Sequence, residues 1–197
     1  MNNSGRPAHM LGDFFFYQML QSFYMLDRAA LDTLIMKNDT NDWWQPALFV
    51  QNTKHLLPPE LEILIDPPPE DQNYNCFLYA FGLHTDAAVL QETKGFIYDS
   101  FVKHLLSIGE LVTTDTPVEG DYVVYQDLVH YPESLTHIGV LQGDKVISKW
   151  AWGPLVQHAL WDVPAEYGDE VFYIKAVQLS RVAALYQQYK GYNQLKQ

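Results

Sequence analysis

The side chain with the clearest chemical potential is Cys76, the only cysteine among the 197 residues. It follows Asn75, a residue type that favours helix N-caps, and it opens an apolar run that ends at Gly82, a residue type common after helix ends. This pattern predicts a helix that begins at Cys76. A helix N-terminus stabilises a thiolate, and its free amides can bind an oxyanion, so Cys76 is a candidate nucleophile. The alternative is a buried cysteine that serves only as a small apolar side chain.

His137 is the candidate base, because a cysteine hydrolase needs an imidazole that takes the thiol proton and returns it to the leaving group. It opens an apolar segment, residues 137–142, that reads as a strand. Gly143 and Asp144 follow and predict a hairpin turn, which places Gln142 opposite Lys145. The alternative is a strand-end histidine with a purely structural role.

The hairpin register predicts which neighbours share a face with His137, because side chains alternate along strands. Ser148 and Trp150 fall on the His137 face, and Lys149 falls on the other. Ser148 is therefore the local candidate for orienting His137, with His158 or Gln157 as alternatives that reach back from beyond the next turn. An ordinary strand serine is the structural alternative, and Trp150 is the aromatic expected to line the site.

Oxyanion support is expected from the Cys76 amide and from polar residues just before it. These candidates for oxyanion or substrate binding are Gln72, Asn73 and Tyr74, and the same residues could simply complete a loop.

Both helices and strands are expected to position these groups. Residues 12–37 carry apolar side chains at helical spacing, with Asp27 and Asp32 at turn or cap positions, and five prolines between residues 58 and 70 predict an extended connector. The segments expected beyond the Cys76 helix are a helix from Gly95 or Tyr98 to Ile108, strands at 111–113, 122–125, 137–142, 145–151 and 171–174, and a closing helix at 178–192. Helices, an antiparallel meander and a helix together indicate an α+β fold.

Ordered motifs in this chain resemble the core of NlpC-type papain-like cysteine peptidases. They are Asn75-Cys76 at a helix start, the Gly-Asp strand at 120–125, and the Thr-His-Ile-Gly-Val strand at 136–140 with its hairpin partner at 143–148. The chain is more similar still to a bacterial branch of that superfamily. This likeness rests on Asn-Cys-x-x-Tyr-Ala-x-Gly-Leu at 75–83 and on segments 148–150, 153–155 and 163–168, and it spans roughly residues 70–175.

The resemblance implies a papain-like core, a Cys-bearing helix packed on an antiparallel sheet, within residues 70–197. It places nucleophile, base and third residue at Cys76, His137 and Ser148, although the family usually has His, Asn or Gln at the third position. Residues 11–69 then form an N-terminal helical subdomain with its Pro-rich connector, and residues 1–10 read like a vector-derived linker.

The implied function is cleavage or modification of an amide bond, as a peptidase, amidase or deamidase. The family commonly acts on cell-wall peptides. The alternative is a catalytically inactive papain-like fold that acts as a protein-binding or toxin-associated module.

The charge and cysteine content of the chain limit the classes of partner and cofactor that it is expected to bind. Twelve basic and 24 acidic residues give a net charge of −12, which disfavours nucleic acid because phosphate binding depends on Lys and Arg. A single cysteine excludes an intrachain disulfide and a multi-cysteine zinc site, and no metal or nucleotide motif is present, so we expect neither metal nor cofactor.

The expected partner is a peptide or protein substrate. We expect no membrane association, because no apolar stretch is long enough to cross a bilayer. Self-association through the N-terminal helices stays open. A single free cysteine and no visible signal peptide favour the cytoplasm, with secretion as an effector as the alternative.

Overall fold

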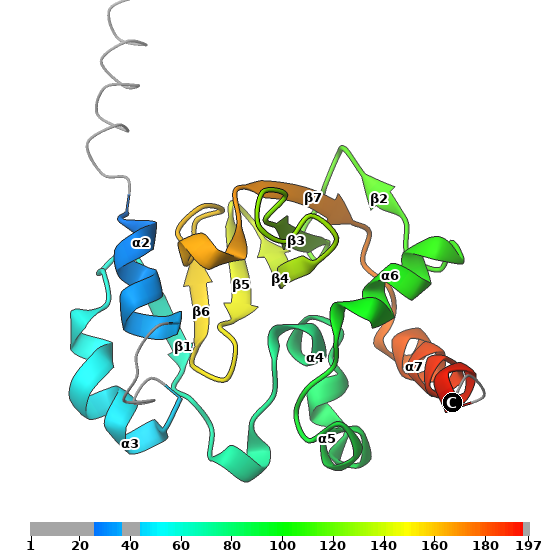
Figure 1. Ribbon diagram of the computed structural model, residues 1–197, viewed down its shortest axis with the longest axis horizontal. Helices are drawn as coiled ribbons and strands as arrows, with labels where there is room; N and C mark the ends of the chain where they lie inside the picture. The colour runs from blue at the N-terminus through cyan, green and yellow to red at the C-terminus, as the bar shows by residue number, and fades with distance from the viewer. Residues whose placement is uncertain (1–25, 37–43, 195–197) are drawn as a thin grey trace, which may run out of the picture.

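A seven-stranded antiparallel sheet organises the chain in the computed structural model, which describes residues 26–36 and 44–194 (Figure 1). The strand order is β1-β6-β5-β4-β3-β7-β2. The strands are β1 (Glu62–Ile65), β2 (Thr113–Thr114), β3 (Tyr122–Gln126), β4 (Leu135–Gln142), β5 (Lys145–Lys149), β6 (Leu155–His158) and β7 (Glu170–Ile174). The expected α+β fold with an antiparallel sheet is therefore confirmed.

Helices gather around this sheet. In Figure 1, α2 and α3 lie beside β1 and β6, α6 and α7 lie toward the β7 and β2 end, and α4 and α5 lie between them. The α-helices are α2 (Arg28–Leu31), α3 (Pro46–Leu48), α4 (Cys76–Ala80), α5 (Ala87–Thr93), α6 (Asp99–Ser107) and α7 (Leu179–Gln194). Shorter helical segments are η1 (Asp32–Met36), η2 (Phe49–Thr53), η3 (Lys54–Leu56), η4 (Glu70–Gln72), η5 (Leu83–Thr85) and η6 (Ala165–Tyr167).

The central hairpin has the predicted register. Gln142 pairs with Lys145, and Val140 pairs with Ile147, around a turn in which Gly143 has a φ of 60°. The β4–β5 ladder ends at Val140 and Ile147, although β4 begins at Leu135 and β5 continues to Lys149. The start of β4 pairs instead with β3, and the end of β5 pairs with β6. The β4 and β5 strands therefore diverge at the start of β4, where the backbone of Ile138 interacts with Cys76.

The sheet is buried on both faces, which gives two apolar clusters. One contains Cys76 and much of α4, together with Val124 and Ile138. The other contains Tyr125, Trp150 and Tyr167. Because neighbouring strand residues alternate between faces, the side chains of β3 to β5 point toward one cluster or toward the other. This division decides which groups meet at Cys76.

The structure also departs from the expected elements. The Pro-rich connector carries β1, which pairs with β6 and so joins the main sheet, and α5 and β6 were not expected. Asp27 caps α2 as expected, with its side chain accepting from two amides. Asp32 is the C-cap residue of α2, one of the two expected kinds of position, and it is buried at the start of η1. The expected helix before residue 26 and the 1–10 segment lie outside the described residues.

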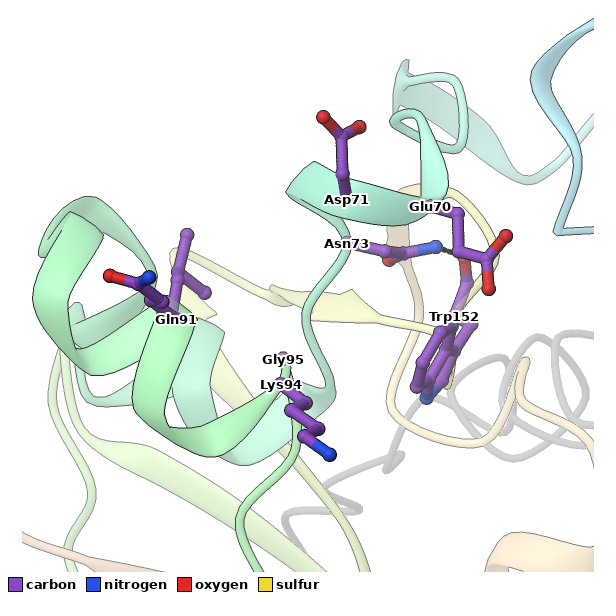
Figure 2. Close-up of a pocket in the computed structure, with 8 residues that line it drawn as sticks. Glu70, Asp71, Asn73, Gln91, Lys94, Gly95 and Trp152 are labelled. Carbon is purple, nitrogen blue, oxygen red and sulfur yellow. Dashed lines mark hydrogen bonds between the residues drawn. The ribbon is translucent and has the colours of Figure 1, made fainter.

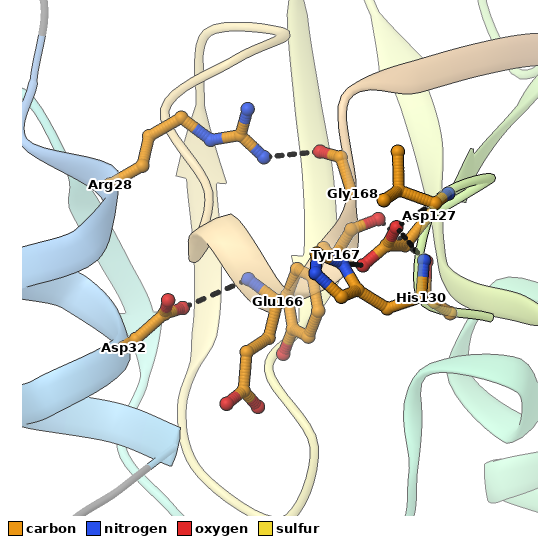
Figure 3. Close-up of polar contacts among 9 residues, drawn as sticks. Arg28, Asp32, Asp127, His130, Glu166, Tyr167 and Gly168 are labelled. Carbon is orange, nitrogen blue, oxygen red and sulfur yellow. Dashed lines mark hydrogen bonds and ion pairs between the residues drawn. The ribbon is translucent and has the colours of Figure 1, made fainter.

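Two side chains, one from α2 and one from the start of η1, bind the segment before β7 (Figure 3). Arg28 donates to the carbonyl oxygens of Val163 at 2.9 Å and Pro164 at 3.3 Å, and also to that of Gly168. Asp32 accepts from the Glu166 amide at 3.0 Å. These bonds bracket η6 and hold Tyr167 in place beneath the sheet.

Candidate functional site

Cys76 lies at the N-terminal end of α4, as predicted. Asn75 caps the helix by accepting from the Leu78 amide at 3.2 Å, and its own side-chain amide donates to Ile97 O at 2.8 Å. The Cys76 side chain is only 5% exposed. Burial raises the pKa of the thiol to about 12, although the amides of Ile138 and Phe77 and the charge of Lys149 act in the opposite direction. Cys76 is therefore a neutral thiol in this closed arrangement.

Lys149 is a buried lysine on the α4 side of the sheet. Its side chain is 1% exposed, and its Nζ donates to Asn73 Oδ1 at 3.0 Å, to Ala151 O at 3.4 Å and to Gly153 O. It also lies 5.1 Å from the centre of the Tyr74 ring. Burial lowers the pKa of Lys149 to about 7, and the charge of Cys76 raises it. Cys76 and Lys149 thus lie within electrostatic reach of each other.

His137 lies on the opposite face of the sheet from α4. It pairs with Tyr125, and its ring stacks on Tyr167 with centroids 3.8 Å apart and planes 6° apart. Both ring nitrogens are buried and have no hydrogen-bond partner among the described residues, which excludes a hydrogen bond to Cys76 here. Burial, and then the charge of His158, hold the pKa of His137 well below its usual value. The structure does not join the two predicted catalytic groups into a hydrogen-bonded pair.

Tyr167 connects the two faces. Its hydroxyl also lacks a hydrogen-bond partner among the described residues. Burial raises its pKa well above the ordinary value, and the charge of Cys76 acts in the same direction. The Ala151 amide favours the ionised form but does not have hydrogen-bond geometry. The Tyr167 ring therefore lies against His137, while its hydroxyl is within electrostatic reach of Cys76.

Ser148 binds His158 and not His137. His158 Nδ1 lies 2.8 Å from Ala159 O, and a carbonyl can only accept, so Nδ1 carries the proton. Nε2 then accepts from the Ser148 hydroxyl at 2.8 Å, and Ser148 Oγ accepts from Trp150 Nε1 at 3.1 Å. These three side chains are fully buried. The expected roles of Ser148 and His158 in orienting His137, and of Trp150 in lining a groove, do not match this arrangement.

The residues before Cys76 differ in their surroundings. Gln72 is exposed in η4. Asn73 is buried, and besides binding Lys149 it accepts from the Tyr74 amide at 2.8 Å and donates to Trp152 O at 2.6 Å. The Tyr74 ring stacks on His84 with centroids 4.7 Å apart. Asn73 therefore has a positioning role between Lys149 and the turn at Trp152, rather than a free amide for an oxyanion.

A pocket of about 620 Å³ opens beside this group (Figure 2). Its walls come from η4, from the end of α5 and from the turn after β5. The lining includes Asn73 and Gly95, where the Gly95 carbonyl accepts from the Asn75 amide at 2.9 Å. Trp152 lines the pocket, whereas the expected Trp150 does not. The pocket is thus separated from Lys149 by Asn73 and the Trp152 turn.

No family model, curated protein or solved structure matches the chain. Within the described residues, no cluster of three or more metal-ligating His, Cys, Asp or Glu side chains is present. Over the same ranges, 26–36 and 44–194, no helix combines the length and apolar character needed to cross a bilayer.

Sequence reasoning missed Lys149 and Tyr167. A signal existed for each, because a lysine inside an otherwise apolar strand is unusual, and Tyr167 lies in the 163–168 segment that carries part of the family resemblance. The sequence pattern did not predict which face of the sheet α4 packs against, and this decides which residues lie near Cys76.

Proposed function

We propose that this chain is a papain-like cysteine hydrolase that cleaves or modifies amide bonds of a peptide or protein, with Cys76 as nucleophile. One observation carries the proposal. The buried side-chain atoms without hydrogen-bond partners among the described residues are the two ring nitrogens of His137 and the hydroxyl of Tyr167. Each unpaired group costs about 1–3 kcal/mol, an expense with no evident purpose if Cys76 were merely an apolar side chain. A substrate group or a water molecule entering between Cys76 and Tyr167 would supply a partner for the Tyr167 hydroxyl, and the His137 nitrogens would gain one when their ring moves or when water reaches them.

The reaction follows from these groups. The Cys76 thiolate attacks the amide carbonyl, a C–S bond forms, and the oxyanion accepts from the free amides of the first turn of α4. Collapse breaks the C–N bond, and the amine leaves with the proton that the thiol gave up. Water then attacks the thioester, releases the acid and restores the thiol. The resemblance assigns the proton transfers to His137, which requires its ring to leave Tyr167 or a water molecule to bridge the gap.

The proposal includes an opening step. A thiol with a pKa of about 12 is almost entirely protonated near neutral pH, and burial is the main cause of that value. Movement of the Trp152 turn would admit water and substrate from the pocket and remove much of this burial. Such a covering segment is common in enzymes that protect an intermediate from water.

A second candidate is a binding module without turnover. Its support is the closed site itself, since Cys76 is 5% exposed and His137 is 0% exposed. In this case the surfaces around the 620 Å³ pocket would carry partner contacts.

The test is acyl-enzyme formation and turnover with a panel of N-acyl peptide amides. Intact mass should show an acyl adduct that hydroxylamine removes, and the adduct must map to Cys76, because the chain has one cysteine. Amine release should disappear in folded Cys76→Ala and Cys76→Ser variants. Unchanged turnover in either variant rejects the nucleophile, and no adduct and no turnover in the native protein favour the binding module.

A further inference from the structure

We propose that Lys149 is the positioning residue for Cys76 chemistry: its buried ammonium stabilises the Cys76 thiolate, so that the working pair is Cys76 and Lys149. The inference rests on the proposed function and names a residue that the family resemblance does not assign. It places the charged partner of the nucleophile on β5, on the face that α4 covers.

The geometry favours a fixed cation. An ammonium group has three N–H donors, and Lys149 Nζ has three oxygen acceptors, on Asn73, Ala151 and Gly153. The face of the Tyr74 ring adds a further interaction that favours positive charge. A neutral amine would have one hydrogen too few for these acceptors. These contacts favour the charged form of Lys149, whereas burial lowers its pKa to about 7.

The placement directs this charge at Cys76. Asn73 and Tyr74, which contact the Lys149 ammonium, lie three and two residues before Cys76 in the chain. The effect is reciprocal, because the Lys149 charge lowers the pKa of Cys76 and the Cys76 charge raises that of Lys149. Among the groups that lower the pKa of Cys76, the charge of Lys149 acts after the backbone amides of Ile138, Phe77 and Cys76.

The other titratable groups around Cys76 do not supply a cation near neutral pH. Tyr74 and Tyr167 have raised pKa values because of burial, so both remain neutral. His137 has a lowered pKa and lies on the other face of the sheet. Lys149 is the remaining charged neighbour among the described residues that influence the Cys76 thiol.

A purely structural role for Lys149 is the competing explanation. Its bonds to Ala151 and Gly153 fasten the turn after β5, where Ala151 has an unfavourable φ of 45°. The test must therefore report local charge at the sulfur rather than stability.

The experiment compares the alkylation of Cys76 by iodoacetate, an anion, and by iodoacetamide, a neutral reagent of similar size. The quantity compared is the rate with iodoacetate divided by the rate with iodoacetamide, because this ratio cancels differences in access to the thiol. In the native protein at low salt, the ratio should exceed that of a free model thiol severalfold, although the net charge of −12 would otherwise repel iodoacetate. Lys149→Met should lower the ratio about tenfold and also lower the rate with iodoacetamide. Lys149→Arg should keep the ratio within about threefold of native.

The matched control is Lys145→Met, which removes a half-exposed lysine from the same strand and face and should leave the ratio unchanged. If Lys149→Met does not fold, the native and Lys149→Arg ratios still decide. A native ratio at or below that of the model thiol, or a ratio that falls in His137→Gln but not in Lys149→Met, overturns the inference. If the ratio overturns the inference but turnover still depends on Cys76, only the role of Lys149 is rejected and the proposed function stands. If native Cys76 reacts with neither reagent, both this inference and the role of Cys76 as nucleophile are rejected.

Discussion

Acid should destabilise this fold through His158, and the structure gives the magnitude. His158 is fully buried, with Nδ1 donating to Ala159 O and Nε2 accepting from Ser148, so its neutral form is the one the fold accommodates. Burial lowers its pKa from 6.5 to about 4. Between these values the unfolded chain binds a proton that the folded chain does not, so stability falls as pH falls. The lowering of the His158 pKa from 6.5 to about 4 corresponds to about 3 kcal/mol of stability lost across that window.

Urea unfolding followed by tryptophan fluorescence, at several pH values from neutral to about 4, measures this loss. His158→Gln should be less stable than native at neutral pH, because a buried hydrogen-bond pair is disrupted, but its stability should fall less steeply with acid. The difference in the acid loss should approach 3 kcal/mol. Carboxylates titrate in the same range, but they do so in both proteins and cancel in the comparison.

The matched control is His55→Gln, which removes an exposed histidine from η3 and should follow the native curve. His137 adds to the acid loss in both proteins, because its pKa is also lowered by burial. Parallel curves for native and His158→Gln would refute the reasoning, since His158 would then titrate alike in the folded and unfolded chains.

Two further substitutions test the segment that holds Tyr167. Gly168→Ala should cost at least about 3 kcal/mol in urea unfolding, because Gly168 has a φ of 91° and an added Cβ would lie 1.9 Å from Gln126 O. Gly120→Ala has the same φ with open space around it, so it should cost only about 1–2 kcal/mol, and equal costs would contradict the close approach. Arg28→Met should cost about 2–3 kcal/mol, because Arg28 donates to three carbonyl oxygens. Arg181→Met removes an exposed ion pair and should change stability by less than about 1 kcal/mol; a similar loss in both would argue against the Arg28 clamp.

Local pattern was sufficient for the elements closest to the candidate site. Asn75 as a cap, Cys76 as the first residue of α4, and the Gln142–Lys145 pairing all follow from residue types that act on their immediate neighbours. The short strand β6 was harder to foresee, because its pairing partners β1 and β5 complete it only after folding. The prolines on both sides of β1 predicted an extended connector instead of a strand, and β1 lies at the edge of the sheet.

By itself the sequence determined that Cys76 begins a capped helix and that His137 and Lys149 point to opposite faces of one hairpin, because capping and strand alternation are local. Only the tertiary structure decided which face α4 covers. Packing of α4 against Val124 and Ile138 placed Cys76 on the side of Lys149, while Tyr167, held by the Arg28 clamp, stacked on His137 from the other side. That choice depends on how apolar surfaces from distant parts of the chain fit together, which no local spacing encodes.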